Sequence, residues 1–81
     1  MEIKNIAIEK GKPVRVLVEL DFDVAVYLAV ITGNKTDEEA ERDLPGAGAH
    51  ANCEIYECLT GELFNRFYSG GFREALRHVG E

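Results

Sequence analysis

The stretch Val14-Arg15-Val16-Leu17-Val18-Glu19-Leu20 decides the fold, because an apolar residue occupies every second position. An alternation with a period of two is typical of a β-strand that turns one face toward a core. The alternation stops at Asp21, and the residues from Val24 to Ile31 are apolar on every side. Such a segment cannot lie on a surface, so we expect a small domain built around one buried element.

The residues before this stretch predict a partner strand. The segment from Ile3 to Glu9 places Ile6 and Ile8 on one face, and Lys10-Gly11-Lys12-Pro13 has the composition of a turn. We therefore expect a β-hairpin over residues 3–20. Because a lone two-stranded hairpin is marginally stable in water, it must be covered by helices, extended by a further strand, or paired with another subunit.

Residues 22–32 fit both a helix and a strand. Asp21 is a good N-cap and Gly33-Asn34 is a good helix stop, which favours a helix. The strand alternative stays open because β-branched residues prefer sheets. Those residues are Val24, Val26, Val30 and Ile31.

Residues 53–68 repeat apolar side chains at steps of four, which predicts an amphipathic helix. Asn52 is the expected N-cap of this helix. The alternative is a hairpin that turns at Thr60-Gly61, because a glycine inside a helix costs about 1 kcal/mol relative to alanine.

Two shorter helical segments complete the chain. Thr36 and Glu39 form a capping-box pattern, which predicts a short exposed helical turn that ends before Pro45. After the break at Ser69-Gly70-Gly71, the spacing of apolar residues predicts a terminal helix over residues 72–79. The whole pattern predicts one α+β domain over residues 1–81, with the N-terminal β-hairpin packed against about three helices.

The size of the chain suggests that it assembles. Hydrophobic residues make up 46% of its 81 residues, which is enough for a core. A core this small leaves only roughly 3–5 kcal/mol of net stability. Two cysteines supply no disulfide framework. We therefore expect the sheet to be extended or covered by homo-oligomerisation, although the sequence does not give the number of subunits.

The charge and the first residues limit the partners. Fifteen acidic residues against nine basic ones give a net charge of −6, which disfavours direct nucleic-acid binding and attachment to anionic membranes. A basic protein surface is the more suitable partner. Met1-Glu2-Ile3-Lys4 does not resemble a signal peptide, and no apolar run approaches the roughly 20 residues of a membrane span. We expect a cytoplasmic protein.

A small-residue loop and a basic corner are candidates for holding a phosphorylated nucleotide. The loop precedes an expected helix N-terminus, where free backbone N–H groups favour an anion. The basic corner sets arginines beside aromatic residues, which suits stacking on a base. The alternatives are an ordinary connector and arginines that cover the edge of a core. The candidate residues are Gly46, Gly48, His50, Asn52, Arg66, Arg73 and Arg77.

A run of carboxylates between residues 37 and 43 is a candidate surface for a basic partner. Such a run is usually a solvated helix face, and the functional interpretation is mimicry of a phosphate array. Its members are Asp37, Glu38, Glu39, Glu41 and Asp43.

The cysteines and histidines predict no metal site, no cofactor and no catalysis. Cys53 and Cys58 are five residues apart and diverge by about 140° on a helix, so they cannot chelate one ion together. We expect Cys58 to face the core. A helix N-terminus can lower a thiol pKa, so Cys53 with His50 leaves a small Cys/His hydrolase as an alternative.

The order of these segments resembles small proteins of tailed bacteriophages, most of them without a known function. The resemblance rests on Val16-Leu17-Val18-Glu19-Leu20-Asp21, the apolar segment at 24–31, Thr32-Gly33-Asn34 and Ile55-Tyr56-Glu57-Cys58-Leu59. It implies a β-hairpin with packed helices and an accessory role such as inhibition of a host protein, in the host cytoplasm. It carries over no functional residue. We expect a non-enzymatic interaction module, with an oligomeric sponge for a phosphorylated nucleotide as the alternative.

Overall fold

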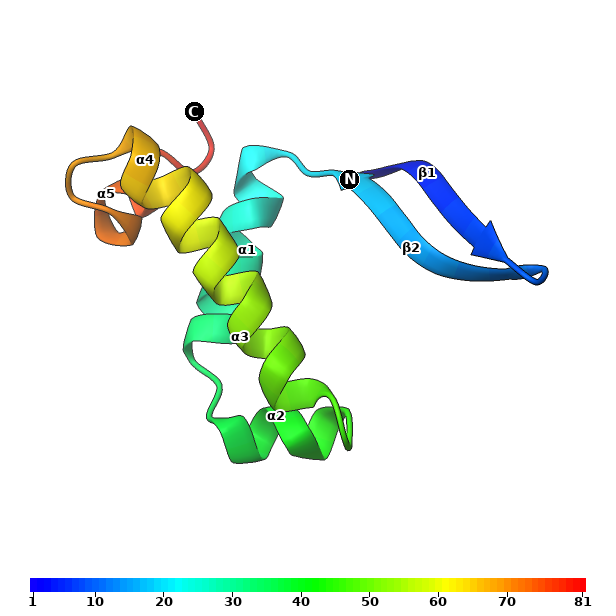
Figure 1. Cartoon of the computed structure of the whole chain (residues 1–81). Coiled ribbons are helices and arrows are strands. Elements are labelled where there is room, and N and C mark those ends of the chain that lie inside the picture. The colour runs from blue at the N-terminus through cyan, green and yellow to red at the C-terminus, as the bar shows by residue number, and fades with distance from the viewer.

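The computed structural model describes all 81 residues and divides them between a β-hairpin and a helical body (Figure 1). The hairpin pairs β1 (Glu2–Glu9) with β2 (Lys12–Glu19) in antiparallel orientation. This arrangement confirms the α+β class. The helical body, residues 22–81, contains α1 (Phe22–Gly33), α2 (Asp37–Asp43), α3 (Gly48–Cys58), the π-helical segment η1 (Leu59–Phe64), α4 (Asn65–Phe67) and α5 (Phe72–Leu76).

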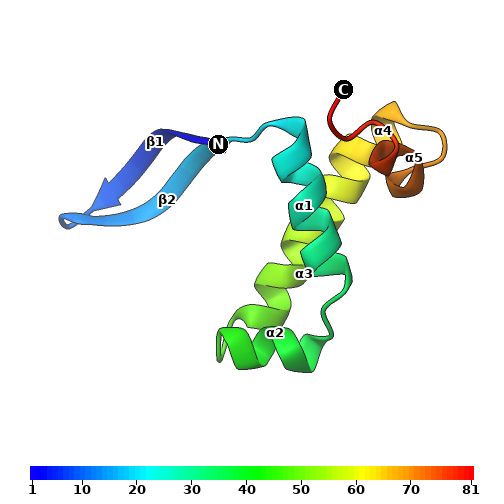
Figure 2. The ribbon, with the colours of Figure 1, turned by 180° about the vertical axis from the view of Figure 1, so that it is seen from behind.

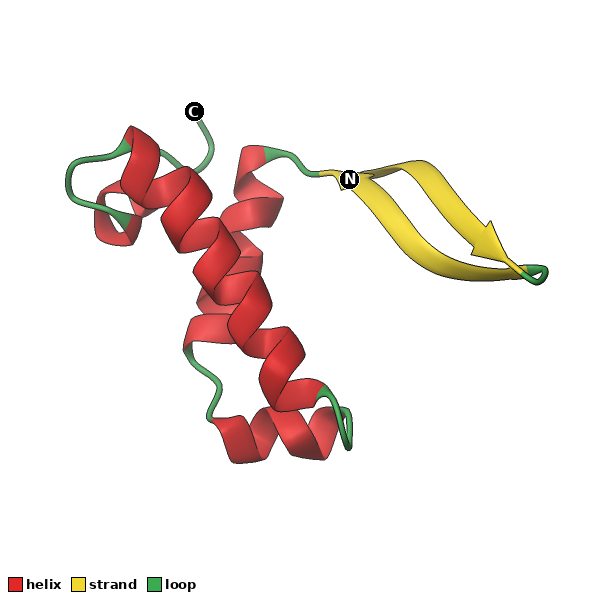
Figure 3. Cartoon of the chain, viewed as in Figure 1, coloured by secondary structure: helices red, strands yellow, loops and turns green.

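The hairpin extends away from the helical body, as the secondary-structure colouring and the view from behind both show (Figures 2 and 3). All eight residues of each strand are exposed. The radius of gyration is 14.4 Å, whereas a compact domain of this length has about 12 Å. The expectation that residues 14–20 turn one face to a core is therefore wrong for the single chain, because the helices bury their apolar surface against one another.

The turn and the register of the hairpin follow from local sequence. Lys10 and Gly11 have φ angles of 52° and 77°, as the two central residues of a type I′ turn require, and that turn matches the twist of the strands. The register shifts twice, and Lys4 on β1 and Val14 on β2 are left without a Cα partner. Such bulges interrupt the ladder. On β2 every residue from Arg15 to Glu19 has a Cα partner, and the shift between the pairs of Leu17 and Val18 comes from the extra residue Lys4 on β1.

The core of the helical body forms around Phe64, which is fully buried. Its ring lies 6.3 Å from the ring of Phe22 on α1 and 5.4 Å from that of Phe72 on α5. Val26, Ala29 and Ala75 complete the buried cluster. The cluster joins α1, η1 and α5, so the helical segments at both ends of the body share one small interior.

The helix expected at 22–32 is confirmed as α1, and the strand alternative is wrong. The helix expected at 53–68 is also confirmed, since α3, η1 and α4 follow one another without a break from Gly48 to Phe67. Gly61 lies inside η1, so the alternative hairpin that turns at Thr60-Gly61 is wrong. A π-helical segment adds a residue to the turn and changes which side chains face inward. In this chain the π-helical segment η1 ends at Phe64, which is its buried residue.

Two boundaries differ from expectation. The long helix begins at Gly48, so the small-residue loop is shorter than predicted and Asn52 lies inside α3 rather than at its cap. The terminal helix spans five residues rather than eight. The capping box is confirmed: Thr36 Oγ1 accepts from the Glu39 N–H at 3.1 Å, and Glu39 Oε1 accepts from the Thr36 N–H at 3.0 Å.

Candidate functional site

The largest hollow is an apolar groove of about 490 Å³ between the hairpin and the helical body. We call it the hairpin groove. Its single charged lining residue is Glu54. β2 contributes Val16, Leu17 and Val18, while the helices contribute Leu28, Ile55 and Leu59. A surface of this composition can bind apolar side chains, and besides the Glu54 carboxylate its one reactive group is the thiol of Cys58.

The hairpin groove lies along the free edge of β2. Successive strand residues point to opposite faces, and yet Val16, Leu17 and Val18 all line the groove. A hollow that meets side chains of both faces lies beside the strand rather than over one face. The sheet contains only β1 and β2, so the outward N–H and C=O groups on this edge have no strand partner. The edge can accept another strand.

The charges on the hairpin are unevenly paired. Lys4 Nζ lies 3.2 Å from a carboxylate oxygen of Glu2 and 3.1 Å from one of Glu19, so a single ammonium faces two acids. Arg15 makes no ion pair within the chain. Its guanidinium is therefore free for a carboxylate from elsewhere.

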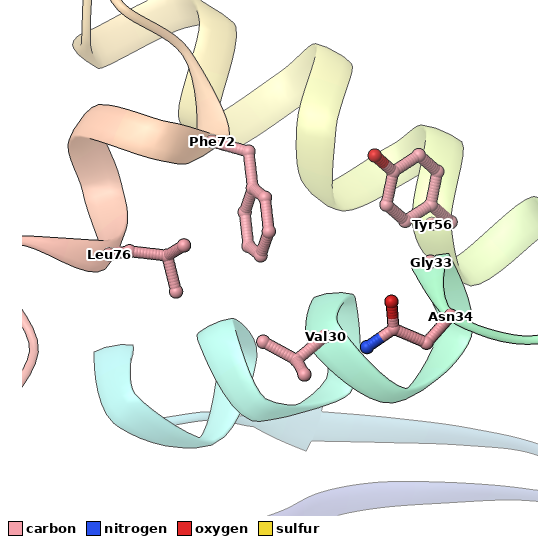
Figure 4. Close-up of a pocket in the computed structure, with 6 residues that line it drawn as sticks. All are labelled: Val30, Gly33, Asn34, Tyr56, Phe72 and Leu76. Atoms are coloured by element: carbon pink, nitrogen blue, oxygen red, sulfur yellow. The ribbon is translucent and has the colours of Figure 1, made fainter.

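A second hollow, of about 310 Å³, lies between α1, α3 and α5 (Figure 4). Phe72 and Leu76 face Val30 across it, and the Tyr56 ring and the Asn34 amide lie at its other end. Tyr56 is close because Gly33 has no side chain: a Cβ there would lie 2.7 Å from the Tyr56 ring. The lining includes no carboxylate, imidazole or thiol, so this hollow offers hydrogen bonds but no acid–base or nucleophilic chemistry.

The predicted anion loop is occupied by a carboxylate of the chain itself. Glu41 accepts hydrogen bonds from the N–H groups of Gly46 and Ala49, both at 2.8 Å. These bonds lower the pKa of Glu41. Gly48 is buried, and a Cβ there would lie 1.8 Å from the Ala40 carbonyl oxygen. A phosphate at this loop would have to displace Glu41.

The remaining residues of the predicted ligand site are separated. Asn52 Nδ2 donates to the Thr32 carbonyl at 2.9 Å and ties α3 to α1, whereas His50 points into solvent with Glu54 at 4.0 Å. Arg66, Arg73 and Arg77 lie on or after α4 and α5, at the end of the body opposite α2 and the loop (Figure 1). The structure therefore brings the loop and the arginines to different ends of the molecule.

Three of the five carboxylates in the predicted acidic surface have partners within the chain. Glu39 closes the capping box, Glu41 holds the loop, and Asp43 pairs with Lys35. The hydrogen bond that Lys35 donates to Asp43 raises the pKa of Lys35, and the hydrogen bonds with Thr36 lower the pKa of Glu39. Asp37 and Glu38 make no ion pair and remain exposed. The surface open to a partner is smaller than the sequence indicates.

Both cysteines are free and exposed, so the expectation that Cys58 faces the core is wrong. Cys58 instead lines the hairpin groove. The Cys53 thiol donates to Glu57 Oε1 at 3.2 Å, which raises its pKa, the reverse of what activates a thiol. No group of three or more His, Cys, Asp or Glu side chains is placed to hold a metal ion.

No family model, curated protein or solved structure matches the chain. None of its helices combines the length and the apolar character that crossing a membrane demands. The residues that the sequence predictions missed are the helical wall of the hairpin groove, Leu28, Ile55 and Cys58. Their positions in α1 and α3 marked them as apolar, but only the direction of the hairpin makes them part of one surface with β2.

Proposed function

We propose that this chain is a non-enzymatic protein-interaction module that recognises a protein partner with the hairpin and the hairpin groove. One observation carries the proposal: every strand residue is exposed, including Ile8 at 64% and Leu17 at 62%. Contiguous exposed apolar surface marks a protein-binding site. Strand addition at a free edge supplies main-chain hydrogen bonds, and a neighbouring apolar groove selects side chains.

The absence of a reactive constellation supports a binding role. The hairpin groove is lined by apolar residues, the Cys58 thiol and one carboxylate, and the hollow at Tyr56 has no carboxylate, imidazole or thiol. Inhibition of a host protein, the role that the resemblance to phage proteins implies, stays a prediction. An inhibitor that adds a strand to a partner would act by occupying a surface, which needs affinity rather than chemistry.

The proposal is tested by capture on the immobilised chain, compared with two variants. Val16→Lys combined with Val18→Lys puts ammonium groups into the hairpin groove and should abolish capture. Tyr27→Lys is the control, because Tyr27 on α1 is also an exposed apolar side chain, at 64%, but does not line the groove. A protein retained by the wild type and Tyr27→Lys but lost from the double variant supports the proposal. Equal retention by all three chains would refute it.

A further inference from the structure

We propose that the protein recognised by the hairpin is a second copy of this chain. The two β2 strands pair antiparallel about a two-fold axis at Leu17, and each hairpin enters the hairpin groove of the other copy. This inference rests on the proposed function, because it names the partner of the same surface.

The segment Arg15–Glu19 is complementary to itself. A two-fold axis perpendicular to a sheet keeps each face on its own side, so a residue meets one of the same face in the second copy. With Leu17 on the axis, Leu17 meets Leu17, Val16 meets Val18, and Arg15 meets Glu19. Apolar and opposite-charge pairs are the cross-strand pairs that stabilise sheets. Arg15, which has no ion pair within the chain, gains one in the dimer.

The edge of β2 suits this pairing better than the edge of β1. Lys4 is an extra residue near the start of β1 and has no Cα partner, whereas every β2 residue from Arg15 to Glu19 has one; the register shift that Lys4 causes falls opposite Leu17 and Val18. A pairing of β1 with itself centred on Ile6 would set Ile3 against Glu9 and bury a carboxylate beside an apolar side chain. On β2, Pro13 and the bulge at Val14 limit pairing toward the turn, which fixes the register on the five-residue segment.

Area explains why the hairpin groove must take part. A stable interface buries about 800 Å² from each copy, roughly one eighth of the 6377 Å² that one chain exposes. Five residues of paired strand do not supply this area alone. A strand added to β2 lies about 4.8 Å from it, and on this edge that position is the groove. There the second hairpin covers Leu28, Ile55 and Leu59 as well as the strand edge.

Light scattering on the full chain gives the first measurement. We expect a mass of twice 9.0 kDa at micromolar concentration, falling toward 9.0 kDa on dilution. Arg15→Glu sets like charges together at both ends of the segment and should raise the dimer dissociation constant about tenfold. Arg15→Glu combined with Glu19→Arg restores the ion pair between the two copies with the charges exchanged, and should recover most of the lost dimer affinity. Arg42→Glu on α2 is the control for net charge and should change little.

Oxidative cross-linking locates the axis. In a chain with Cys53→Ser and Cys58→Ala, Leu17→Cys should form a covalent dimer, because opposed residues in antiparallel strands have Cα atoms about 4.5–5.5 Å apart, within the range of a disulfide. Ile6→Cys, at a matched place on β1, should stay monomeric. A dimer linked through Ile6→Cys but not through Leu17→Cys would overturn the assignment of the edge.

The failure of this inference is distinguishable from that of the proposed function. A chain that stays at 9.0 kDa into the millimolar range refutes the second copy. If Val16→Lys with Val18→Lys then still abolishes capture of another protein, the hairpin remains a binding surface and only its partner was misassigned. A dimer that survives both charge reversal at Arg15 and the lysines in the groove refutes the role of the hairpin altogether.

Discussion

In the helical body, Phe64 is fully buried and lies near the rings of Phe22 and Phe72, whereas in the hairpin Leu17 is 62% exposed. Both parts are rich in apolar residues, so composition does not separate them. Packing separates them: the apolar faces of α1, η1 and α5 meet one another in the buried cluster, while no residue of the two-stranded sheet belongs to it. One part is held by internal packing, and the other is a two-stranded hairpin, which is marginally stable in water by itself.

Phe64→Ala should unfold the helical body, and a folded variant would contradict the statement that internal packing holds this part together. Removing a buried aromatic ring destabilises a core by about 3–5 kcal/mol. Since a domain of this size has roughly the same net stability, the variant should be largely unfolded by far-ultraviolet circular dichroism. Phe67→Ala is the matched control, because Phe67 is 66% exposed one turn later, and it should retain the wild-type transition. Equal losses in both variants would mean that the interior does not centre on Phe64.

Gly48→Ala tests the packing of α2 against α3. The added methyl group would lie 1.8 Å from the Ala40 carbonyl oxygen, so the two helices must separate. Overpacking against backbone costs about 3 kcal/mol at the upper end of its usual range. The midpoint of urea unfolding should fall sharply, and the loop held by Glu41 should exchange its amide hydrogens faster. An unchanged midpoint would show that α2 is not packed as described.

Gly61→Ala is the opposite case. A Cβ at Gly61 meets nothing within 4 Å, and the residue lies inside a helical segment. Alanine reduces the freedom of the unfolded chain and should stabilise the helical body by about 0.5–1 kcal/mol, measured by urea unfolding. A loss of stability instead would indicate that the π-helical turn needs the freedom of glycine.

The fold was predictable where the pattern was local. The turn at Lys10-Gly11, the capping box of Thr36 and the helix over residues 22–32 all depend on neighbours in sequence, and the structure confirms them. Asp21 stands at the N-cap of α1 but makes no side-chain capping hydrogen bond. Two features were not predictable: the π-helical turn at Gly61, and the direction in which the hairpin leaves Leu20. Both depend on how distant apolar faces meet.

The candidate site, too, was predictable in its local features and not in its contacts between distant segments. The alternation of Val14 to Leu20 predicted a strand, but it could not show that its neighbours would be Leu28 and Ile55 rather than a core. The glycine-rich loop predicts an anion site because the N–H groups at a helix N-terminus have no partner within the helix. The carboxylate that takes them, Glu41, precedes the loop in the chain, and nothing in its spacing distinguishes it from the other acids of α2.

Acid should loosen the loop through Glu41. The N–H groups of Ala49 and Gly46 lower the pKa of Glu41 below its ordinary 4.5. Between the folded and the unfolded pKa, the unfolded chain therefore binds more protons than the folded chain, and acid favours unfolding. The contribution is fully present above about pH 4.5 and is lost as the pH falls through the lower folded value. Glu41→Gln should therefore reduce the fall in stability over this pH range. An identical acid profile in the variant, from thermal melts across the range, would contradict the assignment.

The smallest effect should come from Ile8→Ser at the outer end of β1. Ile8 is 64% exposed, and nothing in the helical body depends on it. Exposed substitutions away from caps and cores usually change stability by less than about 0.5 kcal/mol. The thermal transition of the helical signal should therefore stay within that margin of the wild type, even if the hairpin itself frays. A loss comparable to that of Phe64→Ala would show that the hairpin and the helices fold as one unit, since a side chain outside the interior could then unfold it.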